Sequence, residues 1–178
     1  MNFEGTRIAG VCVVEAERHA DERGFFARTW DTNEFREHGL NGDLVQCSVS
    51  YNARRGTLRG LHYQVRPHEE AKLVRCTAGA IFDVAVDLRP TSPTFKSWFG
   101  VELSAENRRA LYIGEGCAHG FLTLTGDAEV LYQMSEFWAP DAARGARWND
   151  PSFGIDWPAD PVVVNERDRT YPDFEVAA

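Results

Sequence analysis

The chain is a succession of short segments in which apolar and polar residues alternate, separated by turns rich in Gly, Pro, Asn and Asp. The clearest segment is Ile81 to Leu88, where Phe82, Val84, Val86 and Leu88 share one side. Alternation with a period of two is typical of β-strands, and no long helical period or internal repeat interrupts it. Short strands without crossover helices predict one all-β antiparallel sandwich or barrel, which we assign to residues 1–178 as a single domain. The further strands expected are Ile8 to Val14, Phe25 to Trp30, Leu44 to Tyr51, Leu58 to Gln64, Lys72 to Cys76, Trp98 to Leu103, Ala110 to Ile113 and His119 to Leu124. A turn at Gly126-Asp127 then leads into Glu129 to Trp138, which predicts a hairpin.

Two regions depart from this pattern. Asp31 to Glu34 resembles a capping box, which predicts one short helix over Phe35 to His38 that ends at Gly39. Trp148 to Phe174 contains several prolines, and we expect irregular structure that covers the barrel.

Charge and hydrophobicity limit the classes of partner. Hydrophobic residues make up 43% of the chain, which argues against disorder, and a net charge of −8 disfavours nucleic-acid binding. Six basic residues between Arg54 and Arg75 are opposed by only two acidic ones. A local cationic patch on an acidic protein suits a small anion such as a nucleotide diphosphate, although it is also compatible with a solvated surface.

Cellular location is inferred from the cysteines and the N-terminus. Cys12, Cys47, Cys76 and Cys117 are widely spaced in apolar or strand-like contexts, which predicts buried free thiols in a reducing compartment. No export signal is recognisable at the N-terminus, and no apolar run approaches the roughly 18 residues of a membrane span. We therefore expect a cytoplasmic protein.

The two predicted strands at residues 58–64 and 72–76 carry side chains that can take part in proton transfer and anion binding. If these strands pair, His62 and Lys72 would share one site. An imidazole can accept a proton and an ammonium can stabilise an anion, which is what proton removal beside a carbonyl requires. A lone histidine in a strand is more often structural, and a lysine directed to solvent would favour that interpretation.

A metal site is the alternative use of these residues. The spacing from Lys72 to Gly79 and the segment from Gly114 to His119 resemble the two metal-binding motifs of cupins, with His62 and His119 at ligand positions. Lys72 would occupy the third ligand position, but an ammonium has no lone pair to offer and repels a cation. We therefore expect no metal.

Eight segments together resemble the dTDP-4-dehydrorhamnose 3,5-epimerase family. The resemblance runs from about Arg7 to Pro172 with the motifs in family order. The segments are residues 21–26, 58–64, 72–76, 83–87, 92–95, 103–107, 118–121 and 148–150.

The resemblance implies a cupin-type jelly-roll barrel that epimerises a nucleotide-linked, typically dTDP-linked, 4-keto-6-deoxy sugar at C3, C5 or both without a cofactor. According to this resemblance, His62 removes the proton from the carbon beside the ketone, and Asp168 orients the imidazole of His62. Tyr132 returns a proton from the opposite face and Lys72 stabilises the enolate oxygen. Taken alone, Tyr132 would be assigned to the core and Asp168 to a surface ion pair.

The same resemblance implies a set of substrate-binding residues. Arg59 would contact the pyrophosphate, and Trp138 would stack on the base. Strict alternation, however, places Arg59 and His62 on opposite faces, so a bulge at Gly60 is required for both to reach one site. The other implied contacts are Arg23, Phe26, Gln46, His119 and Arg167.

Four positions depart from the family pattern: Arg28, Ser48, Ala143 and Gly114. The first three lie at or near the nucleotide-binding region, so they bear on which nucleotide is bound. The resemblance also implies a homodimer in which N-terminal strands complete the neighbour's site, and the run Ile8 to Val14 would suit such an edge. The alternatives are a non-catalytic nucleotide-sugar-binding or assembly module, and a different keto-sugar isomerase.

Overall fold

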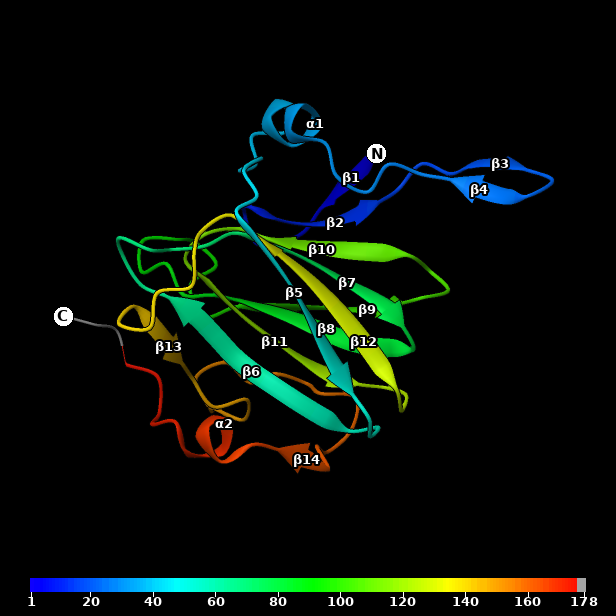
Figure 1. Cartoon of the computed structure of the whole chain (residues 1–178). Helices are drawn as coiled ribbons and strands as arrows, with labels where there is room; N and C mark the ends of the chain where they lie inside the picture. The colour runs from blue at the N-terminus through cyan, green and yellow to red at the C-terminus, as the bar shows by residue number, and fades with distance from the viewer. Residues whose placement is uncertain (176–178) are drawn as a thin grey trace.

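A computed structural model describes residues 1–175 and contains two antiparallel sheets packed face to face (Figure 1). The first sheet has the order β1-β2-β10-β7-β12-β5, and the second has the order β13-β6-β11-β8-β9 with β14 parallel to β6. No hydrogen bonds join the two sheets into a closed barrel in this part of the chain, so the predicted jelly roll is an open one. The strands of the first sheet are β1 (Asn2–Gly5), β2 (Val11–Glu15), β5 (Gln46–Asn52), β7 (Lys72–Ala78), β10 (Arg109–Ile113) and β12 (Ala128–Met134). Those of the second are β6 (Thr57–Gln64), β8 (Ala80–Asp87), β9 (Trp98–Ser104), β11 (Cys117–Thr123), β13 (Ala143–Gly145) and β14 (Val163–Val164).

The core lies between the sheets and follows from the alternation of side chains. Val74 of β7 and Val130 of β12 meet Ile81 and Ala85 of β8, and all four are fully buried. Because burial of each such side chain contributes roughly 1.5–3 kcal/mol, this layer fixes which face of every strand points inward.

The outer faces are covered by the less regular parts of the chain. The apolar side of β8 predicted from sequence, with Val84 and Val86, packs outward against Phe153 of the C-terminal segment. The inward side of β8 therefore carries Asp83 and Asp87, both fully buried. The C-terminal segment contributes only β13, β14 and the short helix α2 (Glu166–Thr170), in keeping with the irregular structure expected there.

The helix α1 (Thr32–Glu37) covers the first sheet; its cap lies in the predicted capping box, but the helix begins at Thr32 and not at Phe35 and ends at Glu37. Asp31 caps it by accepting hydrogen bonds from the backbone of Asn33 and Glu34. The Glu34 carboxylate binds the N-terminal ammonium of Met1 at 2.7 Å instead of returning to the cap. Phe35 from this helix is fully buried.

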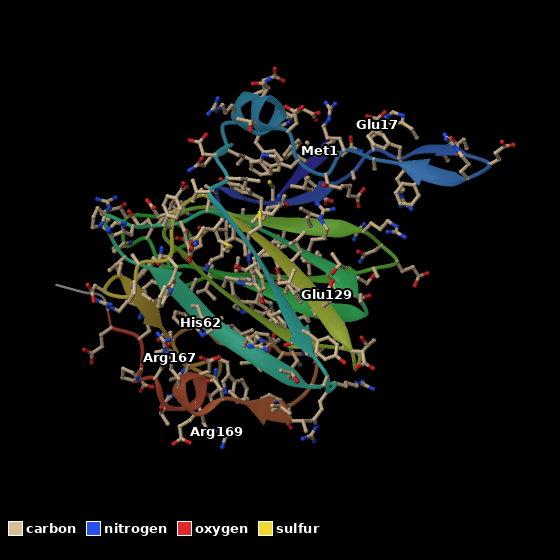
Figure 2. The ribbon with its side chains drawn as sticks, viewed as in Figure 1. Met1, Glu17, His62, Glu129, Arg167 and Arg169 are labelled. Carbon is tan, nitrogen blue, oxygen red and sulfur yellow. The ribbon has the colours of Figure 1, made fainter. Side chains whose placement is uncertain are left out.

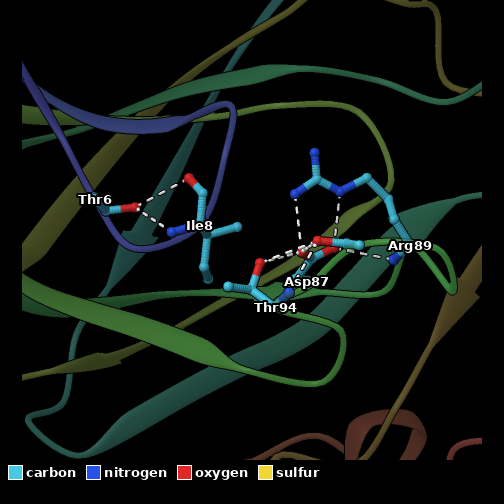
Figure 3. A network of polar contacts seen from close by, with 6 residues as sticks. Thr6, Ile8, Asp87, Arg89 and Thr94 are labelled. Atoms are coloured by element: carbon cyan, nitrogen blue, oxygen red, sulfur yellow. Dashed lines mark hydrogen bonds and ion pairs between the residues drawn. The ribbon is translucent and has the colours of Figure 1, made fainter.

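Asp87 at the end of β8 anchors the loop that follows it (Figure 3). Its carboxylate accepts two hydrogen bonds from the Arg89 guanidinium and one from each hydroxyl of Ser92 and Thr94. Burial acts to raise the pKa of Asp87, but these hydrogen bonds prevail and lower it to about 2.

Several sequence-based expectations are wrong in detail. Residues 128–134 do not form a hairpin with the preceding strand, because β12 crosses to the first sheet between β5 and β7. Of Phe25 to Trp30, only Phe25 and Phe26 belong to a strand, β4 (Gly24–Phe26), which pairs with β3 (His19–Asp21). Cys47 is exposed, whereas Cys12, Cys76 and Cys117 are buried free thiols as expected.

The N-terminal region has two parts with different surroundings. Val11 to Val14 is buried between β1 and β10, so the apolar run predicted as an outer strand is not an edge. The β3–β4 hairpin projects from the body of the molecule (Figure 1). In the described residues, no helix has the length and apolar character needed to cross a membrane.

Candidate active site

A cavity of about 230 Å³ opens between the two sheets. Strands of both sheets contribute its walls, which explains how residues distant in sequence meet there. The side chains that line it are Ser50, Arg59, His62, Lys72, His119, Phe121 and Tyr132. His62 and Lys72 therefore share a site, but not by pairing of their strands, because β6 and β7 belong to opposite sheets.

A bulge in β6 allows Arg59 and His62 to line the same cavity. In the ladder with β11, His119 lies opposite His62 and Phe121 lies opposite Arg59, so β6 has one more residue than β11 in this interval. Gly60 supplies the irregularity with φ +119°, and its Cα faces Gly120 so closely that a Cβ would lie 2.6 Å away. This is the change of parity that the predicted bulge required.

His62 is held by a carboxylate from the other end of the chain. Its Nε2 lies 2.7 Å from Oδ1 of Asp168, and Oδ2 of Asp168 accepts the backbone N–H of Gly60 at 2.9 Å. Asp168 is fully buried, whereas the His62 side chain is 43% exposed. The carboxylate thus fixes the orientation of the ring, while part of the His62 side chain remains exposed.

Asp168 is positioned by α2 and its cap. Asn165 precedes the helix, and its side chain accepts a hydrogen bond from the Asp168 backbone at 2.7 Å. Burial acts to raise the pKa of Asp168, but hydrogen bonds from His62 and Gly60, with the charges of His62 and Arg167, lower it overall. An ionised Asp168 can only accept, so Nε2 of His62 carries a hydrogen, and in the neutral form of the ring Nδ1 is the acceptor.

Tyr132 enters the cavity from the opposite sheet and packs against the core. Its hydroxyl lies 3.1 Å from Oγ of Ser50. Burial raises the pKa of Tyr132 well above its usual value, while the hydrogen bond with Ser50 and the charge of Arg59 oppose that rise. The phenol is therefore protonated at neutral pH.

Lys72 is largely buried, as the sequence required for any role beyond a surface charge. Its Nζ pairs with Glu70 at 2.8 Å, and the two side chains are only 11% and 12% exposed. Because Lys72 lines the cavity with His62 and Tyr132, its ammonium is placed where it can meet an anion.

His119 forms a second pair of imidazole and carboxylate at the back of the cavity. Its Nε2 lies 2.7 Å from Oδ1 of Asp83, and both side chains are buried. Burial raises the pKa of Asp83, against the opposing influence of His119 and the charge of Lys72. The other carboxylate oxygen of Asp83 has no hydrogen-bond partner among the described residues.

A second cavity of about 190 Å³ adjoins the first at His62. Arg167 on α2 and Trp138 line it, and Figure 2 shows Arg167 beside His62. Trp138 is 65% exposed, and its backbone N–H donates to the Gln46 side chain at 2.6 Å. Five of the seven expected substrate contacts, Gln46, Arg59, His119, Trp138 and Arg167, are thus at or beside this pair of cavities.

Arg23 and Phe26 lie elsewhere. Both are on the exposed β3–β4 hairpin, where Arg23 pairs with Asp21 and Phe26 is 73% exposed. Neither lines the two cavities described above. Within one chain, therefore, the structure does not bring these two predicted contacts to the site.

The polar and charged residues at the site that sequence reasoning missed include Ser50, Asn52, Glu70 and Asp83. A signal for two of them existed, because Gln46, Ser48, Ser50 and Asn52 occupy alternate positions of β5 and form a polar stripe. Asn52 is buried and accepts a hydrogen bond from Nε of Arg59 at 2.8 Å. A larger cavity, of about 680 Å³, lies apart from these residues beside Phe25 and Arg108.

In the described residues, no three His, Cys, Asp or Glu side chains are grouped as a metal site would require. The donor set around Lys72 also does not suit a cation, because an ammonium occupies the position where cupins have a ligand. What the residues do combine is an oriented imidazole, a partly buried phenol and an ammonium around one cavity.

The fold and the site define an open jelly-roll protein equipped for proton transfer beside an anionic ligand. A family model described as dTDP-4-dehydrorhamnose 3,5-epimerase matches residues 5–175. The chain therefore belongs to the dTDP-4-dehydrorhamnose 3,5-epimerase family, which confirms the resemblance found in the sequence and its assignment to an epimerase-like isomerase.

Individual relatives agree over nearly the whole chain. The dTDP-4-dehydrorhamnose 3,5-epimerase of Pseudomonas aeruginosa is 48% identical over 171 residues, which cover 94% of this chain and 93% of the relative. The crystal structure of the Elizabethkingia anophelis enzyme of the same name superposes with a TM-score of 0.94 at 38% identity, covering 98% and 96% of the two chains. That of the Bacillus anthracis enzyme, with TDP and PPi bound, gives 0.93 at 39% identity, covering 97% and 99%. The jelly-roll expectation is confirmed by these likenesses.

Proposed function

We propose that this protein epimerises a dTDP-linked 4-keto-6-deoxy sugar at C3, C5 or both, with His62 as base and Tyr132 as acid. The observation that supports it best is the position of these two groups on opposite walls of one cavity. His62 comes from β6 of the second sheet and Tyr132 from β12 of the first. Inversion of a carbon needs a proton removed from one face and returned to the other, which such an arrangement provides.

The proton transfer follows from the polarity of the ketone. The 4-keto group acidifies the protons on its neighbouring carbons, and Nδ1 of His62 accepts one of them while Asp168 stabilises the resulting imidazolium. The negative charge moves to the ketone oxygen, where Lys72 compensates it. Tyr132 then gives its hydroxyl proton to the carbon from the opposite side.

The nucleotide diphosphate would occupy the cationic and aromatic side of the two cavities. Arg59 and Arg167 offer planar donors suited to phosphate oxygens, and the exposed ring of Trp138 offers a surface for the base. Bound TDP in the Bacillus anthracis relative supports a thymidine nucleotide. At Arg28, Ser48 and Ala143 this chain departs from the family pattern, so its recognition of the nucleotide would differ there from that of relatives with the usual residues.

We further propose a homodimer. Arg23 and Phe26 cannot serve the site of their own chain from the projecting hairpin, but a second copy would bring them to its neighbour's site. The outer side of β5 also exposes Val49 and Tyr51, at 57% and 59%, on the edge of the first sheet. A second copy packed there would cover this apolar edge. The free thiols fit a reducing cytoplasm.

Proton exchange tests the proposal directly. dTDP-4-keto-6-deoxyglucose incubated with the protein in deuterated water should gain deuterium at C3, C5 or both, and Tyr132→Phe should reduce incorporation. Bound substrate without label at either carbon would overturn the epimerase function. The alternative, a non-catalytic binding module, predicts that Tyr132→Phe and Asp168→Asn bind the nucleotide sugar as the unmodified protein does and that none of the three exchanges a proton.

A further inference from the structure

The proposed mechanism does not explain how Tyr132 regains the proton that it gives to the sugar. Once its phenol has given a proton to carbon, a partly buried tyrosinate remains, and its partial removal from water disfavours that charged form. The group must regain a proton before the enzyme can act on another carbon or another substrate. A route is therefore needed between the hydroxyl of Tyr132 and solvent.

Ser50 is the polar side chain that contacts this hydroxyl among the described residues. Its Oγ lies 3.1 Å from Oη of Tyr132, and Ser50 itself lines the cavity. The two residues belong to neighbouring strands, where Ser50 of β5 is paired diagonally with Tyr132 of β12. Both residues line the cavity, so the hydroxyl of Ser50 is placed to pass a proton between cavity water and the partly buried phenol of Tyr132.

The surroundings of Ser50 favour its acting as a donor. Nδ2 of the buried Asn52 lies 3.4 Å from Oγ of Ser50, and the same amide nitrogen is fixed by a 3.1 Å hydrogen bond to Ala128. An amide N–H can only donate, so a lone pair of Ser50 faces Asn52 and its single proton is free to point to Tyr132. Oδ1 of Asn52 meanwhile holds Arg59, which links this arrangement to the proposed phosphate contact.

We propose that Ser50 returns the proton to Tyr132 after each reprotonation of the sugar. The O–H bond of Tyr132 breaks as the new C–H bond forms. The tyrosinate then takes the proton of Ser50 in the same step in which Ser50 takes a proton from cavity water, so no serine alkoxide forms. The hydroxide left in the cavity receives the proton that His62 removed from the sugar. His62 takes one proton from the sugar and Tyr132 gives one to it, so this transfer restores both residues without another reactant. This role rests on the proposed function of Tyr132.

The test compares the first turnover with later ones. In Ser50→Ala, about one equivalent of solvent deuterium per site should enter substrate at close to the unmodified rate, because Tyr132 begins each experiment protonated. Steady-state turnover should then fall by about 10-fold or more while KM changes less than about threefold, since a lost proton-transfer partner typically costs 10²–10⁴ when no substitute exists. Ser50→Thr keeps the hydroxyl and should restore steady-state turnover.

Other outcomes overturn the inference. Unchanged steady-state turnover in Ser50→Ala would show that Tyr132 recovers its proton elsewhere. Equal losses in the first and later turnovers, or no rescue by Ser50→Thr, would mean that Ser50 only supports the site's structure. Thermal unfolding and dTDP binding of both variants are measured alongside to reveal a folding defect. Failure of the unmodified protein to exchange any proton is a different result, because it removes the proposed function itself.

Discussion

His62 and His119 lie directly opposite each other on the neighbouring strands β6 and β11, and each is bound to its own buried carboxylate. Their environments differ: the His62 side chain is 43% exposed, whereas that of His119 is 6% exposed. Asp168 reaches His62 from the C-terminal helix, and Asp83 reaches His119 from β8 within the sheet. The accessible member of the two is therefore the one suited to take a proton from substrate, and the buried one is suited to shape the cavity.

Replacing Asp168 by Asn should reduce kcat by about 100-fold or more, with a small change in KM. If the new amide oxygen keeps the hydrogen bond from Gly60, its NH₂ group faces Nε2 of His62. Nε2 must then accept, the ring hydrogen moves to Nδ1, and the base is lost. Steady-state kinetics and deuterium incorporation measure the effect.

Asp160→Asn, on the exposed part of the same C-terminal segment, provides the control and should retain normal kinetics. An Asp168→Asn variant with normal kcat would contradict the assignment of His62 and Asp168 as one functional unit. Thermal unfolding shows whether Asp168→Asn folds. Asp168→Glu is compared in parallel, because it keeps a carboxylate in a shifted position. This variant should preserve the tautomer of His62 and part of the activity.

Much of the fold could be predicted because a period of two is a strong local signal. Ile81 to Leu88 was recognised as a strand, and the structure assigns Ala80–Asp87 to β8. The choice of partner strand is not local, however, and alternation says nothing about it. Alternation therefore leaves open whether Leu58 to Gln64 pairs with Lys72 to Cys76, and the structure places the two strands in opposite sheets. For the same reason the predicted hairpin between β12 and the preceding strand is wrong.

The same limit applies to the site: the sequence of one strand predicts features of that strand, but not its contacts with residues distant in the chain. Gly60 pointed to a bulge, because only a break in alternation could bring Arg59 and His62 together. Asp168 carried no such signal, since a carboxylate between two arginines looks like a surface residue until α2 packs on β6. Only the resemblance to the family identified it. Ser50 and Asn52 were overlooked because polar residues on an edge strand are ordinarily solvated.

Gly60→Ala should destabilise the protein by about 2 kcal/mol or more, because both the positive φ and the close approach exclude a side chain. A Cβ at this position would lie 2.6 Å from Cα of Gly120 and 2.8 Å from the carbonyl oxygen of His119. Urea unfolding measures the loss. Gly5→Ala on the edge strand β1 has no atom within 4 Å of the added carbon and should change stability little. Equal stability of the two variants would contradict the tight contact at the bulge.

Lys72 and Glu70 should behave as a coupled pair in folding stability. Lys72→Met leaves the Glu70 carboxylate largely buried without its partner, which typically costs roughly 3 kcal/mol. The double variant with Glu70→Gln removes both charges and should be less destabilised than Lys72→Met alone. A double-mutant cycle in urea measures the coupling free energy. Additive effects would show that the two charges do not interact in solution.

Asp87 should contribute to stability only above acidic pH. Its folded-state pKa of about 2 is below that of an unfolded aspartate near 4, so the stabilisation is complete above about pH 4 and is lost as the pH falls toward 2. Asp87→Asn should therefore cost about 2 kcal/mol at pH 7, with a difference from the unmodified protein that shrinks below pH 4. Unfolding free energies from pH 7 to pH 3 provide the measurement. Glu106→Gln, at an exposed position, should show no such trend.

Mixed dimers should reveal whether two chains build each site. Arg23 on the β3–β4 hairpin is remote from the cavity of its own chain, so we expect Arg23→Ala and His62→Ala homodimers both to be severely impaired. A heterodimer of these two variants, purified with two different tags, then contains one site with both changes and one site with neither. It should regain about half the activity of the unmodified dimer. If each chain instead formed its own site, both sites of the heterodimer would carry one defect and activity would remain low. Sedimentation at micromolar concentration establishes that the purified species is a dimer, and a monomer there would exclude the shared site.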